Sequence, residues 1–307
     1  MNDSSAALRT SMATATDLQS MARTMKTIAA SNIGQYEAAV RSLDAYYGVV
    51  QDSLSACLRA FRGKANLSNR LGAGGADGSA GAIVFGSDQG LVGQFNEAVR
   101  ERVLAGVDAP PRFSIVWPVG ERIAAALAER GVANLRAFPL PVSINAVSVL
   151  VARLLVEIEA SLTKEGLREI YVFHHRPARG SGYQAVCQRL LPLDRDWERD
   201  LIARPQSSKT IAQVLPAGDA TLRACIGEYL FVSLFRACAE SLTSENAARL
   251  AAMQRAEKNI GERLQVLTQT FHRQRQGAID EELFDLVAGF EAQQASLNIP
   301  KRENTQN

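Results

Sequence analysis

Hydrophobic residues recur at alternating spacings of three and four positions near the start of the chain. From about Ser5 to Arg62 the sequence is rich in residues that favour helices, and the second half of this stretch carries one continuous apolar seam. The alternation is the 3.5-residue repeat of a left-handed coiled coil, and a helical bundle seldom sustains it so long within one helix. The seam consists of Ile33, Tyr36, Val40, Leu43, Tyr47, Val50, Leu54, Cys57 and Phe61.

The same spacing continues upstream with one change of phase. Leu18, Met21, Met25 and Ile28 follow the rule, and an offset separates them from Ile33. An offset of this kind changes the winding locally and does not end a helix. We therefore expect these four residues to extend the buried seam towards the N-terminus.

A second long segment, from about Gly218 to Leu297, contains no proline. Proline breaks helix interiors, so nothing forbids one helix of about eighty residues, roughly 120 Å long. Charged residues recur every few positions and exclude a membrane span, which leaves a coiled coil as the expected structure. Its two heptad runs are Ile260, Leu264, Leu267 and Phe271, followed by Ile279, Leu283, Leu286 and Phe290.

Both arms are connected to the same middle region, one before it and one after it in the sequence, so the simplest way for them to pair is antiparallel. The C-terminal arm is longer by about twenty residues, which predicts a single-helix overhang of roughly 30 Å. An isolated helix frays in water. We therefore expect the tip of this arm to lie inside another protein.

The middle region alternates short apolar runs with helical patterns, which predicts an α/β sheet with right-handed crossovers. The expected fold class is α/β plus α: a long antiparallel coiled coil of N- and C-terminal helices with a central Rossmann-like α/β domain. The predicted parts are an N-terminal helix at 1–65, a glycine-rich link at 66–80, the domain at 81–216, a C-terminal helix at 217–300 and a tail at 301–307. Strands are expected at 82–85, 113–117 and 135–138, a hairpin at 170–175 and 183–191, and helices ending near 104 and spanning 121–129 and 145–164.

The sequence gives little evidence for a catalytic or metal site. The loop from Gly86 to Gly93 follows a strand, but its glycines match neither G-x-G-x-x-G nor a loop ending in G-K-[ST], so a tight strand-to-helix turn is the favoured interpretation, with Ser87 or Asp88 bonding local amides. His174 and His175 are neighbours on a strand and point to opposite faces, which disfavours a shared metal. His272 lies among arginines, where we expect a solvated or partner-facing role.

Composition adds three exclusions. The formal net charge of +2 gives no broad basic excess for nucleic acid. The N-terminus lacks an apolar signal core, and no stretch reaches the length of a membrane span, which argues against direct membrane insertion. The cysteines Cys57, Cys187, Cys225 and Cys238 have no zinc-site spacing, and we interpret them as small buried residues in a reducing compartment.

Three motifs in order resemble the gamma subunit of F-type ATP synthases, and the resemblance covers nearly the whole chain. The first is Met25 to Ser31, MKTIAAS, which is similar to the family's AMKMVAA. The second is Ser87 to Asn96, SDQGLVGQFN, similar to SDRGLCGxxN. The third lies in the C-terminal arm, where SENAARLAAM begins at Ser244, Asn259 follows at the family's spacing, and RQGAIDEEL at Arg275 is similar to RQAxITxEL.

The resemblance implies a central rotor shaft with no catalytic residues and no cofactor. Its implied partners are the alpha and beta subunits of the catalytic head, the epsilon subunit and the membrane c-ring. It also implies a peripheral position on the cytoplasmic face of a bacterial inner membrane. Two alternatives from the residues stay open: a ligand- or nucleotide-binding α/β module on coiled-coil arms, and a homodimeric structural coiled coil.

The resemblance also assigns roles to residues. Beta-subunit contacts are implied for Met25, Lys26, Arg249, Arg275, Gln276 and Glu282. An apolar bearing tip is implied for Leu286, Val287, Phe290 and Leu297, and a face towards the membrane ring for Arg204. Lys26 has an equally weighted alternative as an ordinary solvated helix lysine. Asp280, Phe290 and Arg204 depart from the family's usual threonine, alanine and glutamate.

Overall fold

The computed structural model describes residues 2–60, 79–107, 113–178, 182–193, 195–203, 214–215 and 219–297. The chain divides into two units, which are described separately: residues 1–24 with 254–307, and residues 25–253. Most of the predicted link at 66–80 and the whole predicted tail lie outside the described residues; the last two link positions belong to a strand.

Two long helices begin and end the described chain. Helix α1 spans Asn2–Ala60 and helix α7 spans Asp219–Leu297. Within residues 25–253 their contacts run in opposite order along the two helices, because Asp44 pairs with Arg236 and Cys57 lies against Cys225. The predicted antiparallel pairing of the two arms is therefore confirmed in this unit.

The first unit shows the same order. The Arg9 guanidinium lies 5.3 Å from the centre of the Phe271 ring, and Arg23 pairs with Glu257 at 3.1 Å. Between these pairs Gly261 comes close to Gln19, where an added Cβ would lie 3.4 Å from the side-chain nitrogen. The helices are thus antiparallel in this unit as well.

The second half of the seam on α1 is confirmed as far as Cys57, while Phe61 lies outside the described residues; upstream the seam was wrongly assigned except at the half-buried Met25. Leu54 is fully buried, and Tyr36, Val50 and Cys57 are buried with it. Upstream, however, Leu18, Met21 and Ile28 are 50%, 59% and 56% exposed, while the alanines at positions 22 and 29 are buried. The inward positions of α1 therefore follow one heptad register without the predicted offset. In the upstream part alanines occupy these positions, whereas the sequence pattern had assigned the larger residues beside them to the seam.

The predicted overhang of the C-terminal helix is confirmed. Helix α7 continues to Leu297, and all residues from 281 to 291 are exposed. The second heptad run faces solvent, since Ile279, Leu283, Leu286 and Phe290 are 53–72% exposed. Among the described residues this run has large apolar side chains and nothing packed over them.

The sheet has four strands in the order β2-β1-β3-β4. Strand β1 (Ser79–Phe85) is parallel to β2 (Phe113–Val119) and to β3 (Leu167–Pro177), while β4 (Tyr183–Leu191) is antiparallel to β3. The hairpin is therefore confirmed. The expected third strand at 135–138 is wrong: it is reduced to two isolated bridges to β2, at Leu135 and Phe138.

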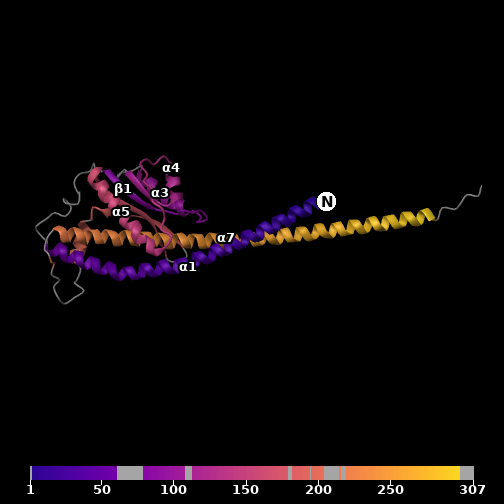
Figure 1. Cartoon of the computed structure of the whole chain (residues 1–307), viewed down its shortest axis with the longest axis horizontal. Coiled ribbons are helices and arrows are strands. Elements are labelled where there is room, and N and C mark those ends of the chain that lie inside the picture. Colours follow the sequence, from indigo (N-terminus) through magenta and orange to yellow (C-terminus); the bar gives the residue numbers. More distant parts are fainter. Residues whose placement is uncertain are drawn as a thin grey trace, which may run out of the picture. The chain divides into compact units, whose positions relative to one another are not determined.

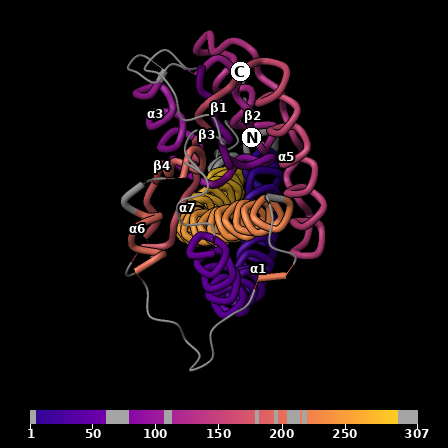
Figure 2. The backbone as a smooth tube through the Cα atoms, turned by 90° about the vertical axis from the view of Figure 1, so that its left-hand side faces the viewer, coloured from indigo at the N-terminus to yellow at the C-terminus, as the bar shows by residue number. Residues whose placement is uncertain are grey.

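Helices cover both faces of this sheet. Helices α3 (Phe95–Val107) and α4 (Glu121–Ala128) pack on one face, while α5 (Ile144–Lys164) and α7 pack on the other around the buried Trp117. Figure 2 shows α3 and α5 on opposite sides of the strands. A short helix, α6 (Arg195–Ala203), was not predicted, and it joins the cluster between α1 and α7 through Leu201.

In the unit of residues 25–253, α7 lies between α1 and the sheet. Both views show this order, with α1 on one side of α7 and the strands on the other (Figures 1 and 2). The contacts agree, because Leu234, Cys238 and Leu242 of α7 pack against the sheet core, whereas Leu222, Ile226 and Tyr229 pack with α1.

We predict that Leu54→Ala lowers the free energy of unfolding of the chain by about 2–5 kcal/mol, because it removes a fully buried side chain from the seam and leaves a cavity. The matched control is Leu18→Ala on the same helix, which should cost only about 0.5 kcal/mol since this leucine is half-exposed. Denaturant unfolding of the two variants tests this assignment. Equal losses of stability would contradict the phase of the seam.

Candidate functional site

Helix α7 is buried on all sides between Ala237 and Asn246. This follows from its place between α1 and the sheet, which leaves no face of the helix to solvent. Six of its ten residues are nonetheless polar: Glu240, Ser241, Thr243, Ser244, Glu245 and Asn246 are each at most 5% exposed. Buried polar groups are costly without partners, so their hydrogen bonds decide how this segment is held.

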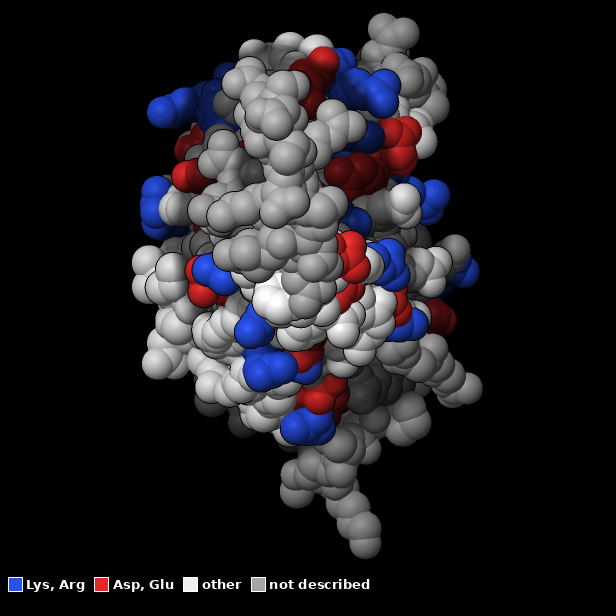
Figure 3. All heavy atoms as spheres, turned by 90° about the vertical axis from the view of Figure 1, so that its right-hand side faces the viewer, with Lys and Arg blue, Asp and Glu red and all other residues white. Residues whose placement is uncertain are grey.

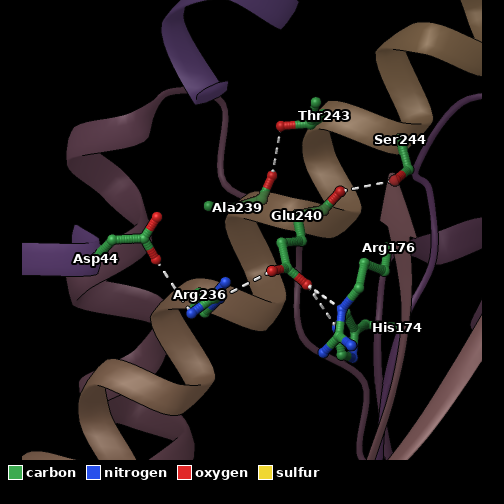
Figure 4. A network of polar contacts seen from close by, with 8 residues as sticks. All are labelled: Asp44, His174, Arg176, Arg236, Ala239, Glu240, Thr243 and Ser244. Atoms are coloured by element: carbon green, nitrogen blue, oxygen red, sulfur yellow. Dashed lines mark hydrogen bonds and ion pairs between the residues drawn. The ribbon is translucent and has the colours of Figure 1, made fainter. Parts of the chain in front are cut away.

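Glu240 is the centre of a polar network that joins three elements (Figure 4). Its Oε2 atom accepts hydrogen bonds from His174 Nε2 and Arg176 Nε of β3, both at 3.1 Å. Its Oε1 atom accepts one from Arg236 Nε at 2.9 Å, one turn earlier on α7. Arg236 also pairs with Asp44 of α1 at 3.2 Å. One carboxylate thus links the sheet, α7 and α1.

The protonation state of this network follows from its geometry. Burial would raise the pKa of Glu240, but hydrogen bonds from His174 and Arg236 and the charge of Arg176 lower it to about 2. The carboxylate is therefore ionised at neutral pH and can only accept hydrogen bonds. His174 must then carry its proton on Nε2, and its buried Nδ1 has no partner among the described residues.

The polar residues that follow Glu240 are satisfied mostly by their own helix. Thr243, Ser244 and Asn246 donate to main-chain carbonyls four residues earlier at 2.8–2.9 Å. Glu245 accepts a hydrogen bond from Arg249 at 2.7 Å. Burial raises the pKa of Glu245, with a further contribution from the charge of Asp88, while Arg249 opposes both. Arg249 is thus already engaged within α7.

The second motif and the residue that follows the first motif both contact the third motif on this part of α7. The second motif packs on the third, where Val92 and Phe95 form a buried cluster with Ala248. The residue after the first motif, Asn32, donates to Asn246 of the third at 3.4 Å. Segments far apart in the sequence therefore meet around this part of α7.

The loop of the second motif is a tight turn, as favoured from the sequence. Asp88 Oδ1 accepts a hydrogen bond from the main-chain N–H of Glu121 at 2.9 Å, and Oδ2 accepts one from the main-chain N–H of Leu140 at 3.3 Å. Asn96 donates to the Ser87 hydroxyl at 2.8 Å. Gly120, at φ 120°, lies so close to Ser87 that a Cβ there would be 2.8 Å from its carbonyl oxygen.

His175 is buried on the opposite face of β3 from His174. Its ring stacks on Phe95 with centroids 3.9 Å apart, and Tyr183 meets it edge-on. Neither ring nitrogen has a partner among the described residues. Burial, with a smaller contribution from His174, lowers the pKa of His175 to about 3. The side chain is a neutral aromatic core residue at physiological pH.

The predicted site residues occupy three different environments. Met25 and Lys26 are half-buried on α1, and Lys26 lies at an inward position between the buried Ala22 and Ala29. Arg249 is half-buried on α7, whereas Arg275, Gln276 and Glu282 are exposed on the same helix.

The predicted tip residues Leu286, Val287 and Phe290 are exposed at 72%, 48% and 63%. The side chain of Leu297 and the whole of Arg204 lie outside the described residues. The predicted site residues whose side chains the structure describes are distributed along the two long helices.

The described part of the chain contains no cluster of three or more histidine, cysteine or acidic side chains that could bind a metal ion. None of its helices combines the length and apolar character needed to cross a membrane. On the face shown in Figure 3, basic and acidic side chains are interspersed, without a patch of one sign.

The cysteines correct one expectation. Cys57 and Cys238 are buried, as predicted, but Cys187 is exposed on β4 and Cys225 is half-buried on α7. Cys187 lies in a stretch of β4, residues 187–189, in which every side chain is exposed.

Known proteins resemble this chain over most of its length. The sequence profile of the family described as ATP synthase matches residues 4–293. An ATP synthase gamma chain of Bacteroides fragilis is 31% identical over 229 residues, which cover 67% of this chain and 72% of the relative. One from Anaeromyxobacter dehalogenans is 26% identical and covers 93% of this chain and 98% of the relative.

Solved structures share the fold. A chain in the rotor of the Euglena gracilis mitochondrial ATP synthase superposes with a TM-score of 0.65 at 14% identity, covering 91% of this chain and 100% of that one. A chain from the central stalk and c-ring of the Tetrahymena thermophila mitochondrial ATP synthase has a TM-score of 0.55 at 20% identity, covering 77% and 99%.

We predict that Glu240→Gln lowers the free energy of unfolding by about 1–3 kcal/mol at pH 7, because the amide removes a charge from three charge-assisted hydrogen bonds. The folded-state pKa lies below the ordinary 4.5, so the wild-type advantage is present above pH 4.5 and is lost as the pH falls towards 2. Unfolding at several pH values measures it. The control is Glu159→Gln, an exposed acid on α5 that should change little; a pH-independent difference for Glu240→Gln would contradict the ionised network.

We also predict that His175→Phe flattens the acid loss of stability. The unfolded imidazole takes up a proton below pH 6.5, but the folded one does so only near pH 3, so the wild type loses up to about 1.4 kcal/mol per pH unit between these values. Phenylalanine keeps the stack on Phe95 without this proton. Unfolding midpoints from pH 7 to pH 4 test it, with the exposed His272→Phe as control; parallel pH profiles for wild type and His175→Phe would refute it.

Proposed function

The chain belongs to the gamma-chain family of ATP synthases and is a central rotor-shaft subunit, and we propose that it couples ion flow to ATP synthesis or hydrolysis without catalytic residues of its own. In this proposal the ions pass through the membrane sector, and nucleotides react in the head formed by alpha and beta subunits. The chain contributes only a turning surface.

The observation that carries the proposal is the pairing of α1 and α7 within one polypeptide. The contacts between Asp44 and Arg236, and between Arg23 and Glu257, have the antiparallel order in both units. A two-helix coil has no axial symmetry, so each angular position presents different side chains to a surrounding subunit. Different contacts change the relative stability of the conformations of that subunit, and the coupling acts equally in the other direction.

The exposed end of α7 supports a bearing within the head. Leu286, Val287 and Phe290 offer apolar surface with few directional bonds, so an apolar sleeve around them would resist rotation little. Leu297 extends the same proposed tip. An isolated helix with such a surface is unfavourable in water, which is a physical reason for it to be enclosed.

The residues proposed to contact beta subunits differ in how exposed their side chains are. Arg275 and Gln276 are exposed and can reach a carboxylate-bearing loop, with the planar guanidinium able to make a bidentate pair. Glu282 is exposed on the next part of the helix. Met25 and Lys26 are half-buried, and Arg249 is hydrogen-bonded to Glu245. We propose that these three residues either contact a beta subunit that lies directly against the coil or stabilise the conformation of the coil.

The other end of the shaft is proposed to meet the membrane c-ring and the epsilon subunit, with Arg204 on the face towards the ring. This places the chain peripherally on the cytoplasmic face of a bacterial inner membrane. The network at Glu240 supports the transfer of torque from such a base, because it fastens β3 to α7 and, through Arg236, to α1.

Two other functions are less well supported. A nucleotide-binding module would need free polar groups in the loop 86–93, but Ser87 and Asp88 bond within the fold. A homodimeric coiled coil would need the apolar seam of α1 to face a second copy, whereas Leu54 and Cys57 pack against α7 of the same chain.

We predict that Arg275→Ala combined with Gln276→Ala lowers ATP-driven ion pumping and ATP turnover of the assembled complex by about tenfold, the effect of about 1.4 kcal/mol of lost coupling energy. Both side chains are exposed, so the shaft should remain folded. The matched control is Arg263→Ala with Gln265→Ala, an exposed pair earlier on the same helix. Unchanged pumping and turnover in an assembled double variant would count against the proposed contact.

A further inference from the structure

Two cysteine side chains meet where α1 and α7 pack together. Cys57 Sγ of α1 lies 3.4 Å from Cys225 Sγ of α7, although 168 positions separate the two residues in sequence. Both are free thiols. The other two cysteines have no such contact among the described residues.

The surrounding structure holds both sulfur atoms in place. Cys57 belongs to the apolar cluster at this end of the coil, with Leu54 and Leu58 on its own helix, and Cys225 packs against the same cluster beside Ile226. A disulfide needs a sulfur–sulfur distance of about 2.05 Å, so the two atoms must approach by about 1.4 Å from 3.4 Å. Side-chain rotation can supply a change of this size without separating the helices.

We propose that Cys57 and Cys225 form a thiol pair that closes to an intramolecular disulfide by exchange with a low-molecular-weight disulfide, and that this bond locks α1 onto α7. The geometry also assigns an order of events. Cys225 is half-buried and accessible to the reagent, whereas Cys57 is 3% exposed and reacts second.

The chemistry balances with oxidised glutathione as the oxidant. The Cys225 thiolate attacks one sulfur of oxidised glutathione, which forms a mixed disulfide and releases one glutathione thiolate. Cys57 then loses its proton and attacks the Cys225 sulfur, which forms the protein disulfide and releases the second glutathione. The two cysteine sulfurs lose two electrons, the glutathione disulfide gains them, and the two thiol protons end on the two glutathione molecules.

The environment of Cys57 makes the second step slow and selective. Burial and the adjacent Cys225 thiol raise the pKa of Cys57 to about 12, and the thiolate is the attacking form. Thiol-reactive reagents in solution should therefore modify Cys57 slowly. The neighbouring sulfur of a mixed disulfide at Cys225 is already within reach, so proximity favours closure of the pair over external attack.

The test treats the full-length chain, alone and in the assembled complex, with millimolar oxidised glutathione, followed by peptide mass spectrometry without reduction. We expect a linked pair of peptides containing Cys57 and Cys225, and a melting temperature about 5 °C above that of the reduced chain. Cys225→Ser, at the half-buried position, should abolish both effects, while Cys187→Ser should leave both intact. Because Cys225→Ser removes the accessible partner, the test does not depend on whether a Cys57 variant folds.

Three results would overturn the proposal. One is a persistent glutathione adduct on Cys225 with no linked peptide. The second is a linkage that involves Cys187 or Cys238 in place of the pair. The third is a linked pair with an unchanged melting temperature, which would refute the locking of the helices.

Discussion

The structure depends on the burial of helix α7 between two other parts of the same chain, helix α1 and the sheet. Within residues 25–253, α7 has α1 on one side and the sheet on the other, so its segment from Ala237 to Asn246 meets no solvent. Apolar residues such as Leu234 and Leu242 fill the side towards the sheet. This single placement explains both the core of the unit and the need for a buried polar network.

A helix in this position could slide or rotate if only apolar contacts held it, because such contacts are not directional. The carboxylate of Glu240 supplies direction, since it must accept hydrogen bonds from β3 and from Arg236 at fixed geometry. Losing any donor leaves a buried charge poorly compensated. The network therefore fixes α7 against the sheet, while Arg236 and Asp44 extend the same constraint to α1.

Large apolar residues at coiled-coil spacing made much of the fold predictable from sequence. The seam through Val50 and Leu54, the two long helices and the hairpin were all predicted. The upstream seam was misassigned because alanines, such as Ala22 and Ala29, occupy its inward positions, and the larger Leu18 and Met21 next to them are exposed. Side-chain size misleads where two helices approach closely. The pattern of α6 was also missed, although Trp197 and Leu201 stand four positions apart on its apolar side.

The candidate site was less predictable for a different reason. A helix segment with Glu240, Ser244 and Glu245 resembles a solvated surface in sequence, and only its place between α1 and the sheet makes these residues buried. Two of the three partners of Glu240 come from β3, more than sixty positions away, so no local sequence pattern predicts them. The spacing of the third motif did identify the right part of α7. It could not show that Arg249 is engaged by Glu245.

The most direct test of the shaft is a cross-link between its two helices in the working complex. Arg23→Cys with Glu257→Cys places two thiols where the native side chains of the two helices pair at 3.1 Å, and Cys187→Ser with Cys225→Ser in the same chain removes the accessible native thiols. A short bifunctional maleimide should cross-link the two new cysteines within one chain, at monomer size, and the assembled complex should still pump ions when supplied with ATP, because the two helices turn as one body. A cross-link between two copies, or the loss of pumping on cross-linking, would contradict the account.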